Sequence, residues 1–92
     1  MLTIALTDKA QSDLEGMHEY NAAICGPEVA NRIVIDVLGQ LESLRTFSGL
    51  AGHHNPRASG ELVLIRYPYV APYRVKDYQV QVLRVLHHRT DR

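Results

Sequence analysis

Two strand-like runs joined by a short polar break decide the fold, and they lie in the stretch RYPYVAPYRVKDYQVQVLRVLHHR at residues 66–89. Residues 69–75 alternate between two faces, and residues 78–86 are rich in valine and leucine, so both runs favour β-strands. Lys76 and Asp77 lie between the runs and predict a two-residue hairpin turn, although they lack the glycine that such turns prefer. The stretch therefore predicts an antiparallel hairpin near the end of the chain.

A third strand is expected just before this hairpin. Residues 61–66 are short and apolar, and Tyr67 and Pro68 can turn the chain into the next run. Pro72 has no backbone N–H to give to a ladder, so we expect a local irregularity beside it. Three consecutive strands with short turns predict an antiparallel meander.

The N-terminal half predicts one strand and two helices. Residues 2–7 alternate between apolar and smaller or polar side chains, which is the period of a strand. Thr7 is a good helix N-cap, and a helical period runs from residue 8 to about residue 22. The Gly-Pro pair at residues 26–27 breaks that period, and a second helix is expected to reach about residue 47.

These elements predict a single α+β domain over residues 1–92. The helix hairpin should cover one face of a four-stranded, mainly antiparallel sheet that the N-terminal strand joins. Gly39 lies inside the second helix, where a close packing contact would explain it. The expected core residues are Leu14, Met17, Ile33, Val37, Leu41, Leu44, Leu64 and Val82.

Composition limits the class of protein. Apolar residues make up 46% of the chain, enough for one core, and no apolar run approaches the roughly 18–20 residues that span a bilayer. The first residues lack the basic start of a signal peptide, and Cys25 is the one cysteine, so we expect no disulfide and a cytoplasmic location.

Charge is distributed unevenly although the net charge is zero. Residues 1–52 contain three basic and seven acidic side chains, a charge of −4. Residues 53–92 contain seven basic and three acidic side chains, a charge of +4. The C-terminal half either faces an anionic partner or balances the other half of the same domain.

Two pairs of histidines are candidates for a metal site, and we expect no metal or cofactor there. His87 and His88 point to opposite faces of a strand, which is poor geometry for a chelate. His53 and His54 lie in a glycine-rich loop, while most carboxylates that could complete a site lie on the helices. Arg84 lies in a largely apolar strand and needs a partner, either a carboxylate within the fold or the phosphate of a ligand.

The chain resembles the RelE/ParE superfamily of bacterial toxins. The resemblance is carried by residues 66–75 and 80–89, where a tyrosine–arginine–valine strand is followed by a turn and a leucine–arginine–valine–leucine–histidine strand. Residues 10–14 (AQSDL) and 44–47 (LRTF) resemble the helix segments of these toxins. The resemblance implies a toxin that a cognate antitoxin protein neutralises.

Two branches of the superfamily have different targets. ParE-like members poison DNA gyrase without chemistry of their own, and RelE-like members cut messenger RNA on the ribosome. Zero net charge, only two lysines, and Val70 where such nucleases often have an arginine all favour the ParE branch. A non-toxic antitoxin-binding relative is a third alternative. In the nuclease alternative the candidate catalytic residues are Arg66, Arg74, Arg84, His87, His88 and Arg89.

Overall fold

The α+β order expected from the sequence is present in the computed structural model, which describes residues 2–46 and 59–87. The elements are β1 (Thr3–Leu6), α1 (Asp8–Cys25), α2 (Pro27–Glu42), β2 (Ser59–Val63), β3 (Tyr69–Lys76), β4 (Gln79–Val82) and β5 (Leu86–His87). The short strand β5 is a fifth member of a sheet that was expected to have four.

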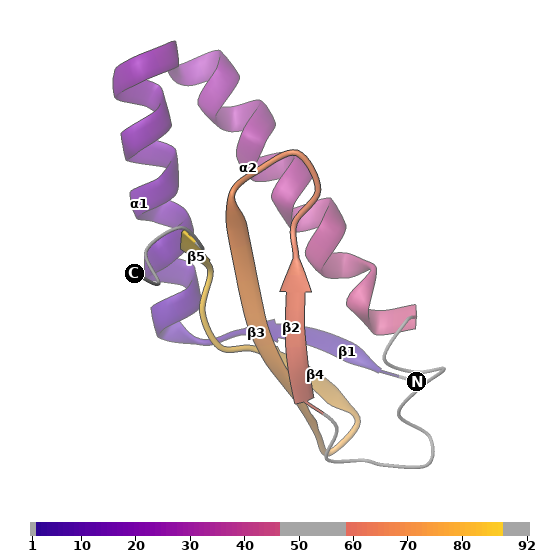
Figure 1. Cartoon of the computed structure of the whole chain (residues 1–92). Coiled ribbons are helices and arrows are strands. Elements are labelled where there is room, and N and C mark those ends of the chain that lie inside the picture. Colours follow the sequence, from indigo (N-terminus) through magenta and orange to yellow (C-terminus); the bar gives the residue numbers. More distant parts are fainter. Residues whose placement is uncertain (1, 47–58, 88–92) are drawn as a thin grey trace.

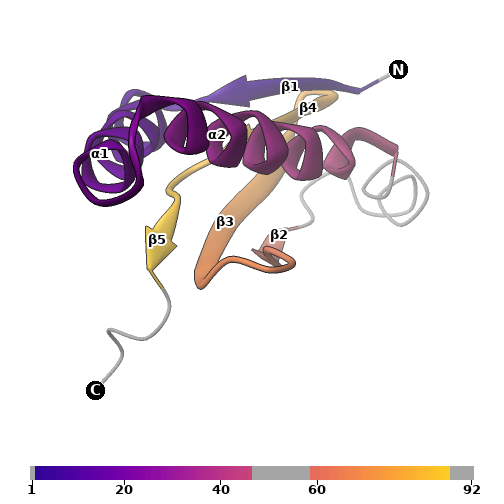
Figure 2. The same cartoon turned by 90° about the horizontal axis from the view of Figure 1, so that it is seen from above.

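Both helices lie on one side of the sheet, as Figures 1 and 2 show. The strand order is β1-β4-β3-β2, and β5 pairs with β3. The expected meander is confirmed, since β3 is antiparallel to both β2 and β4. β1 enters the sheet parallel to β4, with Thr3 opposite Gln79, so the sheet is mixed. In Figure 1 β1 runs almost across the direction of β2, which reflects a strong twist.

Local contacts explain where the helices begin and end. The side chain of Thr7 accepts a hydrogen bond from the Ala10 N–H at 3.1 Å, which confirms Thr7 as the N-cap of α1. Gly26 both ends α1 and precedes α2, with a φ of 93° that other residues adopt only with strain. Its N–H donates to the Ala22 carbonyl, and Pro27 then occupies the first turn of α2.

The core lies between the helix hairpin and the sheet. Of the eight residues expected there, seven are buried, and Ile33 is half-buried against the others. Leu41 is 1% exposed and is among the largest fully buried side chains. The explanation offered for Gly39 is wrong, because within the described residues a Cβ at that position would meet no atom of a packing neighbour within 4 Å.

Two strand boundaries differ from the sequence prediction. β2 begins at Ser59 and ends at Val63, a few residues earlier than expected. The β3–β4 turn comprises Asp77 and Tyr78, one residue later than expected, with Lys76 paired to Gln79. Both turn residues have positive φ, 54° and 59°, as a type I′ turn requires. A tyrosine rarely adopts a positive φ, so the residue preferences of turns favoured Lys76 and Asp77 over the observed pair, Asp77 and Tyr78.

The last predicted strand, residues 78–86, is not continuous. β4 pairs Val82 with Tyr73, whereas β5 pairs Leu86 with Val70. Three residues therefore lie opposite two, which makes this break a β-bulge. The Leu83 N–H donates to the Pro72 carbonyl at 2.8 Å across it. The expected irregularity beside Pro72 is confirmed, and the extra residue is in the partner strand.

Candidate functional site

The bulge directs Arg84 towards α1, where Asp13 accepts three hydrogen bonds. Arg84 donates from Nε to Oδ2 at 2.8 Å and from Nη2 to Oδ1 at 3.1 Å. The Val85 N–H also donates to Oδ2, at 2.9 Å. The carboxylate therefore neutralises the arginine and satisfies a backbone donor that the bulge leaves outside the ladder.

Electrostatics agree with this geometry. The hydrogen bond from Arg84 lowers the pKa of Asp13, and its effect outweighs the opposing effect of burial. The side chain of Asp13 is 17% exposed and that of Arg84 is 40% exposed, so the pair lies partly inside the protein. Of the two roles that the sequence left open for Arg84, an internal ion pair is the one observed. Asp13 lay off the apolar stripe of its helix and was not identified as the partner.

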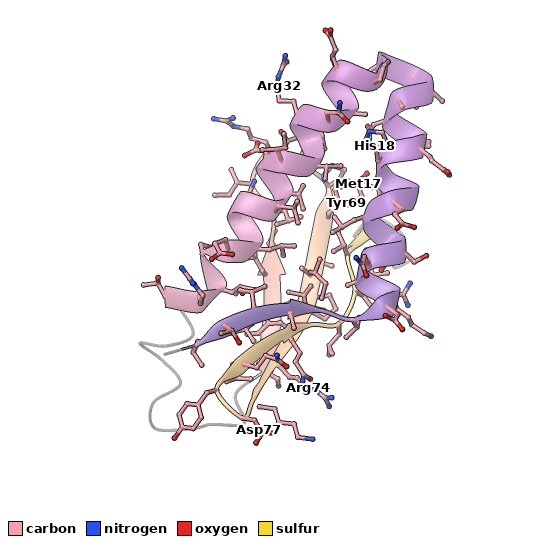
Figure 3. All side chains as sticks on the ribbon, turned by 180° about the vertical axis from the view of Figure 1, so that it is seen from behind. Met17, His18, Arg32, Tyr69, Arg74 and Asp77 are labelled. Carbon is pink, nitrogen blue, oxygen red and sulfur yellow. The ribbon has the colours of Figure 1, made fainter. Side chains whose placement is uncertain are left out.

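The other candidate arginines lie far apart. Arg74 is exposed on β3 close to the β3–β4 turn, which Asp77 marks in Figure 3, and its Nε donates to Gln81 Oε1 at 2.6 Å. Arg66 lies before the opposite end of β3 and is exposed, with a φ of 78°. Seven residues lie between these two positions in the sequence, and Arg84 points to α1.

His87 lies at the end of the described chain. Its ring packs edge-on against Tyr69, with ring centroids 5.3 Å apart and an interplanar angle of 81°. Tyr69 in turn packs against the core. His88 and Arg89 lie outside the described residues, as do His53 and His54.

The described residues contain no group of three or more histidine, cysteine or acidic side chains that could hold a metal ion. In the same part of the chain, no helix is long and apolar enough to cross a membrane. The exposed Cys25 forms no disulfide.

The sheet face turned away from the helices, which we call the open face, has an apolar end and a polar end. Val63, Val70 and Leu86 are cross-strand neighbours in one row, and Val63 is 61% exposed. Towards the β3–β4 turn the same face carries Arg74, which pairs across the strands with Gln81. Such a face suits an amphipathic protein segment better than a small, uniformly charged ligand.

Comparison with known proteins identifies the family. Curated protein sequences give no significant match. A solved structure described as the chromosomal ParDE TA system from P. aeruginosa has a TM-score of 0.82 and 28% sequence identity, over 95% of this chain and 96% of that chain. The family model for the ParE toxin of the type II toxin–antitoxin system, parDE, matches residues 4–92. This match covers nearly the whole sequence, and the chain therefore belongs to the ParE toxin family of type II toxin–antitoxin systems.

Proposed function

We propose that this toxin poisons DNA gyrase through a protein–protein contact, in the cytoplasm, and that a cognate antitoxin neutralises it. The observation that carries the proposal is the dispersal of the candidate catalytic residues. Arg84 is paired with Asp13, Arg66 lies before the start of β3, and Arg74 lies near the end of that strand. A protein that acts by binding needs no convergent acid, base and phosphate ligand.

Messenger RNA cleavage makes a stricter demand. A general base or acid has to lie within hydrogen-bond reach of the scissile phosphate, and a cation has to stabilise the charge that develops on it. Within residues 2–46 and 59–87, His87 packs on Tyr69, Arg74 donates to Gln81, and Arg84 is paired with Asp13. The nuclease alternative then depends on His88 and Arg89, which lie outside the described residues.

The open face offers a surface for the antitoxin. Its apolar row across β2, β3 and β5 can take the apolar side of an amphipathic segment. Arg74 and Lys76, further along β3, are exposed and can face acidic residues of the same segment. An antitoxin that orders on this face would cover unpaired apolar surface and basic charge together.

The decisive experiment measures both candidate activities on the same preparation. Purified toxin should inhibit supercoiling by purified gyrase, and primer extension on transcripts within minutes of induction should find the messenger RNA intact. Codon-periodic cuts with unaffected supercoiling would overturn the proposal. If those cuts then vanish in a folded His87→Ala, His88→Ala double variant, the endoribonuclease takes its place.

Neutralisation is tested separately. Co-expression with the product of the neighbouring gene should restore growth, and Val70→Asp on the open face should weaken that rescue because it places a charge within the apolar row. A chain that is harmless when induced alone, and that the neighbouring product does not bind, would contradict the toxin proposal itself.

A further inference from the structure

Residues 65–68, which belong to the connection between β2 and β3, are fixed on α2 by two side chains. The amide of Gln40 binds the backbone of Ile65 on both sides, accepting from its N–H at 2.7 Å and donating to its carbonyl at 3.1 Å. One helical turn earlier, Asp36 accepts a hydrogen bond from the Tyr67 hydroxyl at 2.7 Å. We call this segment, Ile65 to Pro68, the β2–β3 tip. Its place on α2 is defined by three hydrogen bonds.

The outward side chains of the tip contribute little to folding. Ile65 is 71% exposed, so the fold uses its backbone and leaves its side chain in water. Arg66 is exposed with a φ of 78°, in the left-handed region that favours glycine. Strained backbone conformations of this kind cluster at sites that bind ligands. Val63, two residues before Ile65, is also largely exposed and belongs to the open face.

The tip carries unbalanced positive charge. Arg66 and Arg32 both act through their charges on the Tyr67 hydroxyl and lower its pKa, against the larger raising effect of the hydrogen bond to Asp36. Arg32 lies one turn before Asp36 on α2 and points away from α1 in Figure 3. Within the described part of the chain neither guanidinium has an ion-pair partner. Asp36 accepts from the neutral Tyr67 hydroxyl, so two basic side chains are set against one acidic side chain, a net charge of +1.

We propose that the β2–β3 tip binds an acidic segment of the antitoxin. Carboxylates of that segment face Arg66 and Arg32, and an apolar side chain of it covers Ile65. Continuity favours the antitoxin as the occupant, because a chain lying on the open face at Val63 reaches Ile65 by following β2 to its end. The proposal rests on the proposed function in requiring a cognate antitoxin, and it extends that contact beyond the sheet to α2.

The test measures the affinity of the purified toxin for the purified product of the neighbouring gene. Arg66→Glu and Arg32→Glu should each weaken binding roughly tenfold by placing like charges together. Lys9→Glu, an exposed charge reversal on α1, should leave affinity unchanged. A double arginine variant combines Arg66→Glu with Arg32→Glu. Raising the salt concentration should weaken binding of the antitoxin to the wild type more than binding to this double variant.

A second variant guards against misfolding. Arg66→Gly relaxes the positive φ and removes the charge, so it should fold at least as stably as the wild type and still bind more weakly. Affinity of the double arginine variant within twofold of the wild type would overturn the proposal. If Val70→Asp weakens binding in that same experiment, the proposed antitoxin contact on the open face survives. Loss of toxicity with unchanged antitoxin affinity would assign the tip to the target and would also overturn it.

Discussion

Asp13 and Gln40 each reach from a helix to bind the backbone of a segment that adjoins a strand, and the two contacts differ in kind. Asp13 on α1 binds the bulge after β4 with a charged, mostly buried carboxylate. Gln40 on α2 binds the backbone of Ile65 with a neutral amide at an exposed site. Water can replace the amide, but it cannot reach the carboxylate site as freely. The first contact should therefore stabilise the whole domain, and the second should mainly position a surface segment.

The core supplies the reference for this comparison. Leu41→Ala should cost about 2–5 kcal/mol, because the side chain is 1% exposed and its removal leaves a cavity. Urea unfolding followed by circular dichroism measures the loss. Leu38→Ala on the same helix is the control, since Leu38 is 41% exposed and should cost far less. Equal losses for the two leucines would contradict the observed packing of α2.

Asp13→Ala should have the next largest effect. It leaves the Val85 N–H and the Arg84 guanidinium without their acceptor, which should cost about 1–3 kcal/mol in the same unfolding measurement. Glu15→Ala, an exposed acid on the same helix, should change little. A double-mutant cycle with Arg84→Ala isolates the ion pair. If the free-energy losses of the two single variants simply add up in the double variant, the carboxylate stabilises the fold through the Val85 backbone alone.

Acid should abolish the advantage that Asp13 confers. Its pKa in the folded protein is lowered from the ordinary value of 3.8, so its contribution is complete above that value and is lost as pH falls towards the folded pKa. The stability difference between the wild type and Asp13→Asn should be largest at about pH 7 and should shrink below about pH 4. A difference that stays constant down to about pH 2 would rule out the carboxylate charge as its source.

Gln40→Ala should have the smallest global effect, about 0.5–1 kcal/mol, because its hydrogen bonds lie at an exposed site. Its local effect should be larger. Hydrogen exchange at the Ile65 amide should accelerate strongly, while the amides of β4 keep their protection. Gln11→Ala on α1 controls for loss of an exposed glutamine. Unchanged exchange at Ile65 would show that the tip does not depend on this contact.

Local patterns in the sequence predicted the elements but not the contacts between distant ones. The alternation at residues 2–7 indicates a strand, yet it carries no information about direction, so the parallel pairing of β1 with β4 could not be read from it. The valine-rich run after Tyr78 has the period of one strand, and the bulge interrupts it without a local signal. Thr7 and Gly26 were predicted because caps and helix breaks depend on near neighbours.

The candidate sites show the same division. The sequence predicted that Arg84 needs a partner because it lies in an apolar strand. It did not identify that partner, Asp13, which lies 71 residues away on α1. Gln40 and Asp36 have the ordinary composition of a solvated helix face, so nothing in the chain marked the tip that they anchor. Side chains that act through long-range contacts became visible only when the fold brought them together.

The parallel pairing of β1 with β4 has a consequence in time. Thr3 lies opposite Gln79, and the Thr7 hydroxyl donates to the Leu83 carbonyl at 2.8 Å, so the first strand waits for partners that are synthesised 76 residues later. At ribosomal speeds that delay is roughly 4–15 s. Throughout it, the apolar side chains of β1 lack the neighbours that finally cover them. The sheet therefore cannot close around β1 until β4 has been made, and a translation product that stops before β4 lacks the strand that β1 needs.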